Sequence, residues 1–199
     1  MLLKFPKELF LASKSPRRAE LLKLVEIPFK IINSSFEEDT IYEKNPDVYV
    51  QKLSFLKAKN CAHAVENGII LSADTIVFYD NSILGKPKDF EEAKYMLNKL
   101  SGNWHEVYTG FTLLDIPSFI SETKYSLTKV KFKKLSEDEI FSYLSTKLPF
   151  DKAGSYGIQD SFFAFFVEEI SGCFYNVIGL PLNKFYVTAI DFIEKLKKN

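Results

Sequence analysis

The sequence predicts an α/β fold built on a mixed, partly antiparallel β-sheet. Apolar, strand-like runs alternate along the chain with segments whose apolar residues recur every three or four positions, as expected for strands interleaved with helices. Two pairs of strand-like runs are joined by short polar turns, at residues 80–82 and 115–118, and such turns connect antiparallel neighbours. The 199 residues contain no internal repeat and no low-complexity linker, so we expect a single domain over residues 1–199.

The N-terminal elements begin with a short apolar strand, Leu9–Ala12, which leads into a helix that opens at Pro16. Proline is favoured at the first helical position, and Ser15 before it is the predicted cap. The elements expected next are a strand at Pro28–Ile32, a polar loop at Ser34–Thr40, a helix at Asn45–Val65, a strand at Gly68–Tyr79 and a return strand at Ile83–Leu84.

The second half of the chain continues the alternation. A helix is expected at Phe90–Leu100, capped by Asp89 and ended by Ser101 and Gly102. The remaining predicted elements are a β-rich stretch at Trp104–Lys133, a short helix at Ser136–Leu144, a glycine-bounded loop at Gly154–Gln159, an apolar strand at Phe162–Ile170, and a C-terminal helix opened by Leu180–Leu182.

Composition limits the kinds of ligand. Basic and acidic residues number 26 each, so no net field attracts a nucleic-acid polymer, and phosphate recognition must be local. Cys61, Cys173, His63 and His105 lack the spacing of a zinc site, which leaves carboxylates to hold any metal and favours Mg²⁺ or Mn²⁺. We expect His105 to pack or cap and His63 to lie exposed. No apolar run is long enough for a membrane span and no signal peptide is visible, so a soluble, cytoplasmic protein without a membrane partner is expected.

Two arginines stand where a helix disfavours positive charge. Arg17 and Arg18 lie in the first turn of the helix opening at Pro16, where the dipole and unpaired N–H groups are partly positive. A bound anion would reverse the sign of this effect, and Ser13 and Ser15 supply hydroxyls beside it. A phosphate cradle and a solvated basic helix end are both open interpretations.

Asp74 and Lys57 are ionisable residues at positions where burial is expected. Asp74 lies in mid-strand between Ser72 and Thr75, and a buried carboxylate there needs a cation, a metal or several hydrogen bonds. We favour a functional role, with a structural pairing to a buried arginine or lysine as the alternative. Lys57 is in line with the apolar face of its helix, so it either extends to solvent along its stem or reaches an anion in a cleft.

Three further residues carry weaker signals. Lys86 is held on a stiff loop between a glycine and a proline, where a solvated lysine is the simpler interpretation. Glu38, in an acidic loop, is either a surface residue or a second oxygen ligand for a metal shared with Asp74. The amide of Gln159 offers a donor and an acceptor that suit the edge of a nucleobase, or it caps the segment that follows.

A series of ordered segments resembles the Maf family of nucleoside triphosphate pyrophosphatases. The segments are SKSPRRAELL at 13–22, EE at 37–38, LKAK at 56–59, SADT at 72–75, GKP at 85–87, LSGNWHEVYTG at 100–110, DKAGSYGIQ at 151–159 and NVIGLPL at 176–182. Their order and spacing extend over almost the whole chain, which makes the resemblance far more specific than any one of them.

The resemblance implies an α/β fold of two lobes around a cleft, similar to the inosine-triphosphate pyrophosphatases. The family cleaves a nucleoside triphosphate between the α and β phosphates, with a divalent metal. Arg17, Thr75 and Gln159 match the positions linked to substrate choice, and their identities are those of the branch that acts on dTTP and UTP. Dimers are frequent in the family, so a homodimer is one expected state.

The resemblance also implies roles for individual residues. Asp74 matches the proton acceptor for the attacking water. Asp74 and Glu38 both match acidic positions near the metal. The residues that match substrate-binding positions are Ser13, Arg17, Arg18, Lys57, Thr75, Lys86 and Gln159.

The chain departs from the family pattern at Tyr108-Thr109-Gly110, which varies the commoner small-residue ending of its motif, and at Asp160. Asp160 follows Gln159 where the family usually has glycine, which adds a charge near the expected base pocket. The alternatives are a 7-methyl-GTP pyrophosphatase of the sister branch and a nucleotide-binding regulator of septum formation without turnover. Modified pyrimidine nucleotides are further expected substrates, which the sequence does not separate from dTTP and UTP.

Overall fold

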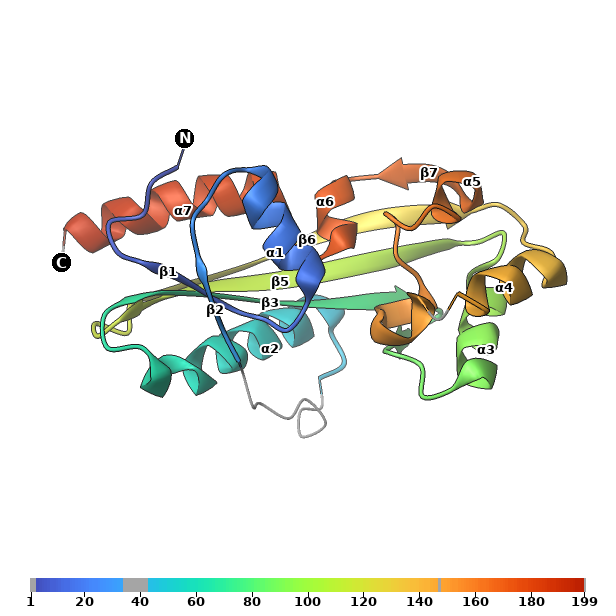
Figure 1. Cartoon of the computed structure of the whole chain (residues 1–199), viewed down its shortest axis with the longest axis horizontal. Helices are drawn as coiled ribbons and strands as arrows, with labels where there is room; N and C mark the ends of the chain where they lie inside the picture. Colours follow the sequence, from blue (N-terminus) through green and yellow to red (C-terminus); the bar gives the residue numbers. More distant parts are fainter. Residues whose placement is uncertain (1–2, 34–42, 147, 199) are drawn as a thin grey trace. The chain divides into compact units, whose positions relative to one another are not determined.

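The structure is a computed structural model that describes residues 3–33, 43–146 and 148–198 (Figure 1). The described elements are β1 Leu9–Ala12, α1 Pro16–Leu24, β2 Lys30–Ile32, α2 Pro46–Asn60, η2 Ala62–Ala64, β3 Gly68–Tyr79, β4 Ser82–Leu84, α3 Phe90–Leu100, β5 Trp104–Ile116, β6 Ser121–Phe132, α4 Glu137–Leu144, η3 Leu148–Asp151, η4 Ala153–Ser155, α5 Phe163–Phe166, β7 Val167–Ser171, α6 Phe174–Ile178 and α7 Leu182–Lys197. Among the described residues, no helix combines the length and the apolar character needed to span a bilayer.

The described strands form a mixed sheet. Their order is β2-β1-β3-β5-β6-β7, with β4 paired to β3. Strand β1 runs parallel to both β2 and β3, and its residue Ala12 lies opposite Ser72. The β3–β4 and β6–β7 pairs are antiparallel. The predicted α/β class with a mixed, partly antiparallel sheet is therefore confirmed.

The described residues separate into two compact units. Unit 1 comprises Met1–Asp74, Thr109–Ser126 and Gly179–Asn199, and unit 2 comprises Thr75–Tyr108 and Leu127–Ile178. The long strands β3, β5 and β6 contribute residues to each unit.

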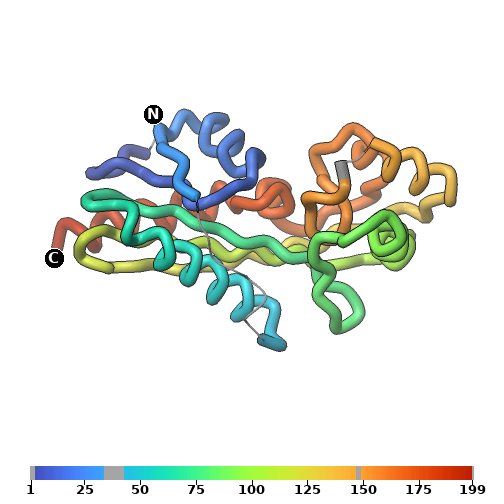
Figure 2. Tube along the Cα trace, turned by 60° about the horizontal axis from the view of Figure 1, so that its bottom comes forward, coloured from blue at the N-terminus to red at the C-terminus, as the bar shows by residue number. Residues whose placement is uncertain are grey.

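In unit 1, helices cover both faces of the sheet. The ring of Phe185 on α7 meets Phe111 of β5 edge to face, with centroids 6.0 Å apart. On the next residue of β5, the hydroxyl of Thr112 lies 3.0 Å from that of Ser54 on α2. Successive side chains of a strand point to opposite faces, so α7 and α2 lie on opposite sides of β5, as Figures 1 and 2 show.

Unit 2 has an aromatic core. The rings of Phe132, Tyr156 and Phe163 lie within 5.2 Å of one another, centroid to centroid, and all three side chains are buried. His105 meets Phe132 edge to face at 4.7 Å. Such ring pairs contribute about 0.5–1.5 kcal/mol each beyond the area they bury, which gives this unit a rigid interior.

The apolar run after the glycine-bounded loop is not the single strand predicted at Phe162–Ile170. Its first part is the helical turn α5, and only Val167–Ser171 forms a strand. Phe163 and Phe166, three residues apart, are buried, whereas Phe165 is 79% exposed. That spacing is helical, because strand alternation would place Phe163 and Phe165 on the same face. The run is apolar at nearly every position, so its sequence did not distinguish the periodicity of a helix from that of a strand.

The predicted start of α3 is confirmed, whereas the predicted end of α2 is not. Asp89 caps α3 as expected, because its carboxylate accepts a hydrogen bond from the N–H of Glu92 at 2.8 Å. The helix predicted at Asn45–Val65 is shorter, because α2 ends at Asn60 and is followed by the 3₁₀ turn η2.

Candidate active site

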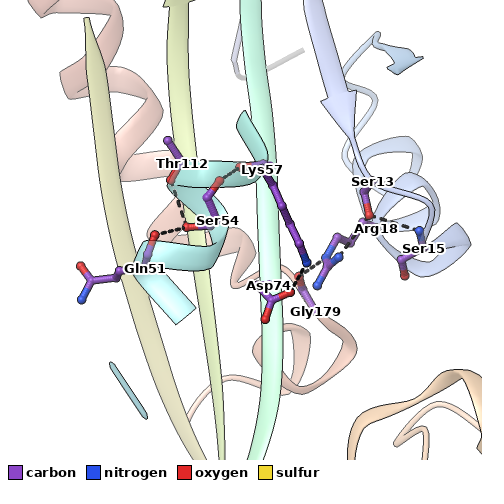
Figure 3. Close-up of polar contacts among 10 residues, drawn as sticks. Ser13, Ser15, Arg18, Gln51, Ser54, Lys57, Asp74, Thr112 and Gly179 are labelled. Carbon is purple, nitrogen blue, oxygen red and sulfur yellow. Dashed lines mark hydrogen bonds and ion pairs between the residues drawn. The ribbon is translucent and has the colours of Figure 1, made fainter. Parts of the chain in front are cut away.

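A buried ion pair lies at the centre of the polar residues in unit 1. The ammonium of Lys57, on α2, pairs with Oδ1 of Asp74, on β3 (Figure 3). The two side chains are 12% and 9% exposed. Lys57 therefore does not extend to solvent but pairs with a carboxylate, and its role in a ligand-binding cleft stays a prediction. Asp74 has the cationic partner that its burial requires, and a catalytic role for it stays a prediction.

Buried hydroxyl groups hold the helical turn that precedes Lys57. The hydroxyl of Ser72, on β3, donates to the backbone carbonyl of Ser54. The hydroxyl of Ser54 lies 2.9 Å from the carbonyl of Gln51 and 3.0 Å from the hydroxyl of Thr112 on β5 (Figure 3). Ser54, Ser72 and Thr112 are fully buried, so water does not compete for these bonds. They fix α2 on the sheet and thereby fix the position of the ammonium.

Close approach of α2 to β5 depends on a glycine. A Cβ atom at Gly110 would lie 2.3 Å from the carbonyl oxygen of Val50, far inside van der Waals contact. Because this neighbour is helix backbone, a larger residue could be accommodated only by moving α2, which carries Lys57.

The turn between β1 and α1 holds Arg18 through two hydrogen bonds. Its Nη1 donates to Oγ of Ser13 at 3.1 Å, and its Nε donates to the carbonyl of Gly179 at 2.9 Å (Figure 3). Arg17 lies beside it, partly buried, and the Pro-Arg-Arg-Ala turn contains no acidic side chain. The guanidinium of Arg18 is thus held at a helix N-terminus, where the helix dipole and the positive charge both favour an anion.

The predicted cap of α1 is wrong in its mechanism. Ser15 occupies the N-cap position, but within the described residues its side chain makes no capping hydrogen bond. Instead, the hydroxyl of Ser13 accepts from the N–H of Ser15 at 3.2 Å, and the same oxygen accepts from Arg18. The sequence pattern correctly indicated that a serine hydroxyl bonds at this turn. The hydroxyl that does so is that of Ser13, which also accepts from Arg18.

In unit 2, two loops that carry predicted site residues are joined. The N–H of Gly154 donates to the carbonyl of Gly85 at 3.0 Å, linking the segment before Gln159 to the loop of Lys86. Gly154 has φ +67°, and a Cβ there would lie 2.8 Å from Val77 on β3. Glycine is therefore needed both for the backbone conformation and for the packing. The side chains of Lys86 and Gln159 are exposed.

The predicted site residues divide between the units. Those in unit 1 are Ser13, Arg17, Arg18, Lys57 and Asp74, and those in unit 2 are Thr75, Lys86 and Gln159. The structure joins Lys57 to Asp74 and Ser13 to Arg18 by direct contacts. The loops that carry Lys86 and Gln159 are joined by the backbone hydrogen bond between Gly154 and Gly85.

The two histidines have the environments that the sequence predicts. His105 is buried, and its Nε2 lies 2.7 Å from the hydroxyl of Tyr156. Burial lowers the pKa of His105 to about 3, so the ring is neutral at physiological pH. It is a packed histidine, as predicted, and His63 is exposed, also as predicted.

The metal donors can be examined only in part. Glu38 and its acidic neighbours lie outside the described residues. Among the residues that are described, no group of three or more His, Cys, Asp or Glu side chains could hold a metal. Of the candidate site residues that the structure describes, only Asp74 carries a carboxylate. Mg²⁺ is often bound by one or two carboxylates plus the phosphates of its substrate, and Asp74 fits that mode rather than an all-protein cage.

Sequence reasoning missed the residues that support the site. Ser54 and Thr112 act through buried hydrogen bonds, and Gly179 accepts from Arg18 over a separation of 161 residues. The only local signal was a polar residue at a position where its neighbours predict burial. That signal is present at Ser72 and Thr112, but it does not name the partner.

A mixed α/β fold with a buried lysine–carboxylate pair and an arginine-bearing strand-to-helix turn defines a protein suited to an anionic, phosphate-type ligand. The chain belongs to the Maf family: the family model described as Maf-like protein matches residues 8–191. The resemblance found from the sequence is thereby confirmed.

Relatives in this family are closely similar. A protein named dTTP/UTP pyrophosphatase from Carboxydothermus hydrogenoformans is 47% identical over 179 residues, which are 90% of this chain and 95% of that protein. One of the same name from Bacillus cytotoxicus is 49% identical over 176 residues, 88% of this chain and 91% of that protein. Among solved structures, the Staphylococcus aureus Ham1 protein matches with a TM-score of 0.45 and 14% identity, over 63% of this chain and 72% of that one.

Proposed function

We propose that this chain hydrolyses dTTP and UTP to the nucleoside monophosphate and pyrophosphate. The observation that carries the proposal is the buried pair of Lys57 and Asp74, which places a cation beside a carboxylate that can accept a proton. The names of the relatives described above support the choice of reaction and of substrate.

In the proposed reaction, a water molecule attacks the α-phosphorus of the nucleotide. Asp74 accepts a proton from that water as the new P–O bond forms. The bond from the α-phosphorus to the bridging oxygen breaks, and pyrophosphate leaves with the bonding electrons. Lys57 orients the carboxylate of Asp74, because the two groups are paired on rigid elements.

The triphosphate brings negative charge that the protein must balance. Phosphoryl transfer is catalysed mainly by positioning and by stabilising charge on the transferred and leaving oxygens. Arg17 and Arg18 would bind phosphate oxygens at the N-terminus of α1, with Ser13 holding Arg18 in place. Lys86 would add a further cation. A divalent cation, Mg²⁺ or Mn²⁺, would supply Lewis-acid charge neutralisation when bound at Asp74 and Glu38.

Base choice is assigned to Gln159, together with Thr75 and Arg17. Uracil and thymine both present an N3–H donor beside the O4 acceptor. A glutamine amide carries a carbonyl acceptor and an NH₂ donor, so it can pair with both atoms at once. Cytosine reverses these two groups, which the same amide orientation does not match. The exposed side chain of Gln159 is compatible with this role.

A cytoplasmic location and a homodimer remain predictions from the sequence. Neither enters the mechanism.

The experiment that tests the function is pyrophosphate release from a panel of nucleotides, with Mg²⁺ and with Mn²⁺. The panel holds dTTP, UTP, CTP, dATP, GTP and 7-methyl-GTP, and a reaction without added metal, in the presence of a chelator, is the control. We expect metal-dependent release confined to dTTP and UTP. Preference for 7-methyl-GTP would favour the sister branch, and nucleotide binding without turnover would favour a regulator.

A further inference from the structure

Gln159 and Asp160 are neighbours in the chain with opposite environments. The side chain of Gln159 is exposed, whereas that of Asp160 is only 9% exposed. Oδ2 of Asp160 accepts a hydrogen bond from the hydroxyl of Tyr143, on α4, at 2.8 Å. The same oxygen lies 3.5 Å from the ammonium of Lys152. Asp160 therefore anchors the chain at the residue directly after Gln159.

Lys152 is buried, with its side chain only 8% exposed. Its ammonium has a carboxylate partner on each side. One is Asp151, at 3.0 Å, whose side chain is 57% exposed and therefore well solvated. The other is Asp160, whose side chain is only 9% exposed. Of these two carboxylates, Asp160 is the less solvated, so water weakens its contact with Lys152 less than it weakens that of Asp151.

The backbone around Gln159 packs against the side chains of Tyr143 and Lys152. The N–H of Gly157 donates to the Tyr143 hydroxyl at 3.3 Å, and the N–H of Asp160 donates to the carbonyl of Gly157 at 2.9 Å. A Cβ atom at Gly157 would lie 2.7 Å from Cε of Lys152. Residues 157–160 therefore form a tight turn seated against Tyr143 and Lys152, with Gln159 within that turn.

Tyr143 provides a rigid support for this turn. Its side chain is fully buried, and its ring lies 4.9 Å from that of Phe163. Burial, with a further contribution from the hydrogen bond to Asp160, raises the pKa of Tyr143 well above its ordinary value. The hydroxyl therefore keeps its proton and remains a donor to the carboxylate of Asp160.

We infer that Asp160 is a positioning residue for base recognition: held by Tyr143 and Lys152, it fixes the turn from which Gln159 presents its amide to the pyrimidine. The inference rests on the proposed function, because that function supplies the base. The amide can discriminate between bases only if its backbone is fixed, since a displaced donor and acceptor would fit cytosine and uracil equally badly. Asp160 touches neither substrate nor reacting atoms in this role.

The test compares three variants of the full chain. Asp160→Ala removes the anchor, Asp160→Asn keeps an acceptor for Tyr143 but loses the charge, and Tyr143→Phe keeps the ring but removes the hydroxyl. Glu168→Gln is the matched control, because Glu168 is a half-exposed carboxylate in unit 2 whose partner is Lys131. The quantities measured are kcat and KM for dTTP, UTP and CTP, and the thermal midpoint Tm.

We expect Asp160→Ala to raise KM for dTTP and UTP about tenfold while kcat stays within about twofold. The preference for dTTP over CTP, as a ratio of kcat/KM, falls by about the same factor. Tyr143→Phe shifts both quantities in the same direction by less, and Glu168→Gln shifts neither. Amide hydrogen exchange of residues 157–160, measured without nucleotide, becomes faster in the Asp160 and Tyr143 variants.

Two kinds of failure are distinguishable. If the wild-type chain releases no pyrophosphate from dTTP or UTP, the proposed function fails. If the wild type is active but the Asp160 and Tyr143 variants keep its KM and its dTTP preference, the inference is overturned, even where Tm falls. Unchanged hydrogen exchange in these variants would overturn it as well. If Asp160→Ala does not fold, Tyr143→Phe and Asp160→Asn decide the question.

Discussion

Lys57 of α2 pairs with Asp74 of β3 where the helix packs on the strand, and the two side chains are 12% and 9% exposed. Such a pair affects both the stability of the fold and the proposed reaction, and different substitutions separate these two effects. Removing one partner takes away the ion pair but keeps a charge in a largely buried position, whereas removing both leaves neither charge.

Asp74→Asn should abolish turnover while the fold persists. Asparagine has nearly the same shape, but its amide does not accept a proton from water, so kcat for dTTP should fall at least about 100-fold. The measurement is pyrophosphate release, with circular dichroism as the check on folding. Asp191→Asn, an exposed aspartate on α7, is the control and should retain full activity. Undiminished turnover in Asp74→Asn would remove Asp74 from the role of proton acceptor.

Lys57→Met should destabilise the chain, because it removes the ammonium that pairs with the largely buried carboxylate of Asp74. The free energy of unfolding should drop by about 3–5 kcal/mol, measured by urea denaturation. The double variant Lys57→Met, Asp74→Leu should recover much of that loss, yet remain inactive. Single and double variants with additive losses would show that the two side chains are not energetically coupled.

Arg18→Lys should weaken nucleotide binding although it keeps the charge. The guanidinium of Arg18 donates from two separate nitrogens, to Ser13 and to Gly179, and a lysine ammonium cannot reproduce that geometry. KM for dTTP should rise by roughly tenfold, the equivalent of about 1.4 kcal/mol. Lys23→Arg, in the last turn of α1, is the control and should leave KM unchanged. Equal KM values for wild type and Arg18→Lys would show that the orientation of Arg18 is not needed for binding.

Much of the site could be anticipated from residues whose type conflicts with their surroundings. Asp74 in an apolar strand, Lys57 on an apolar helix face and the arginines in the first turn of α1 were all found in this way. Such conflicts mark a position but do not identify its partner. The pairing of Lys57 with Asp74 depends on the register of α2 on the sheet, which Ser72, Thr112 and Gly110 set from distant parts of the sequence.

Local patterns failed where two structures satisfy the same local rule. The apolar run after Gln159 is equally compatible with a strand and with a buried helical turn, and tertiary packing of Phe163 and Phe166 decided in favour of the turn. From the sequence, Asp160 could be identified only as a charge at a position where the family usually has glycine. Its contacts with Tyr143 and Lys152 join three segments that no periodicity relates.

His105 should make stability depend on pH. Burial lowers its pKa in the folded state to about 3, against an ordinary value of 6.5 that applies when the chain is unfolded. Between these two values the unfolded state binds more protons than the folded state, so the free energy of unfolding decreases as pH falls below about 6.5. The contribution of one such group approaches about 1.4 kcal/mol per pH unit. Above pH 7 both states are neutral and the effect vanishes.

The measurement for His105 is urea denaturation of the wild type and of His105→Asn at pH 7.5, 6.5, 5.5 and 4.5. Carboxylates also titrate at the acid end, so the informative quantity is the difference between the two chains at each pH. The variant loses the bond to Tyr156 and is less stable at pH 7.5, but its stability should fall less steeply as the pH is lowered. His63→Asn is the control, because His63 is exposed and its removal should leave the slope of the wild type unchanged. Parallel curves for wild type and His105→Asn would show that His105 does not carry the acid sensitivity.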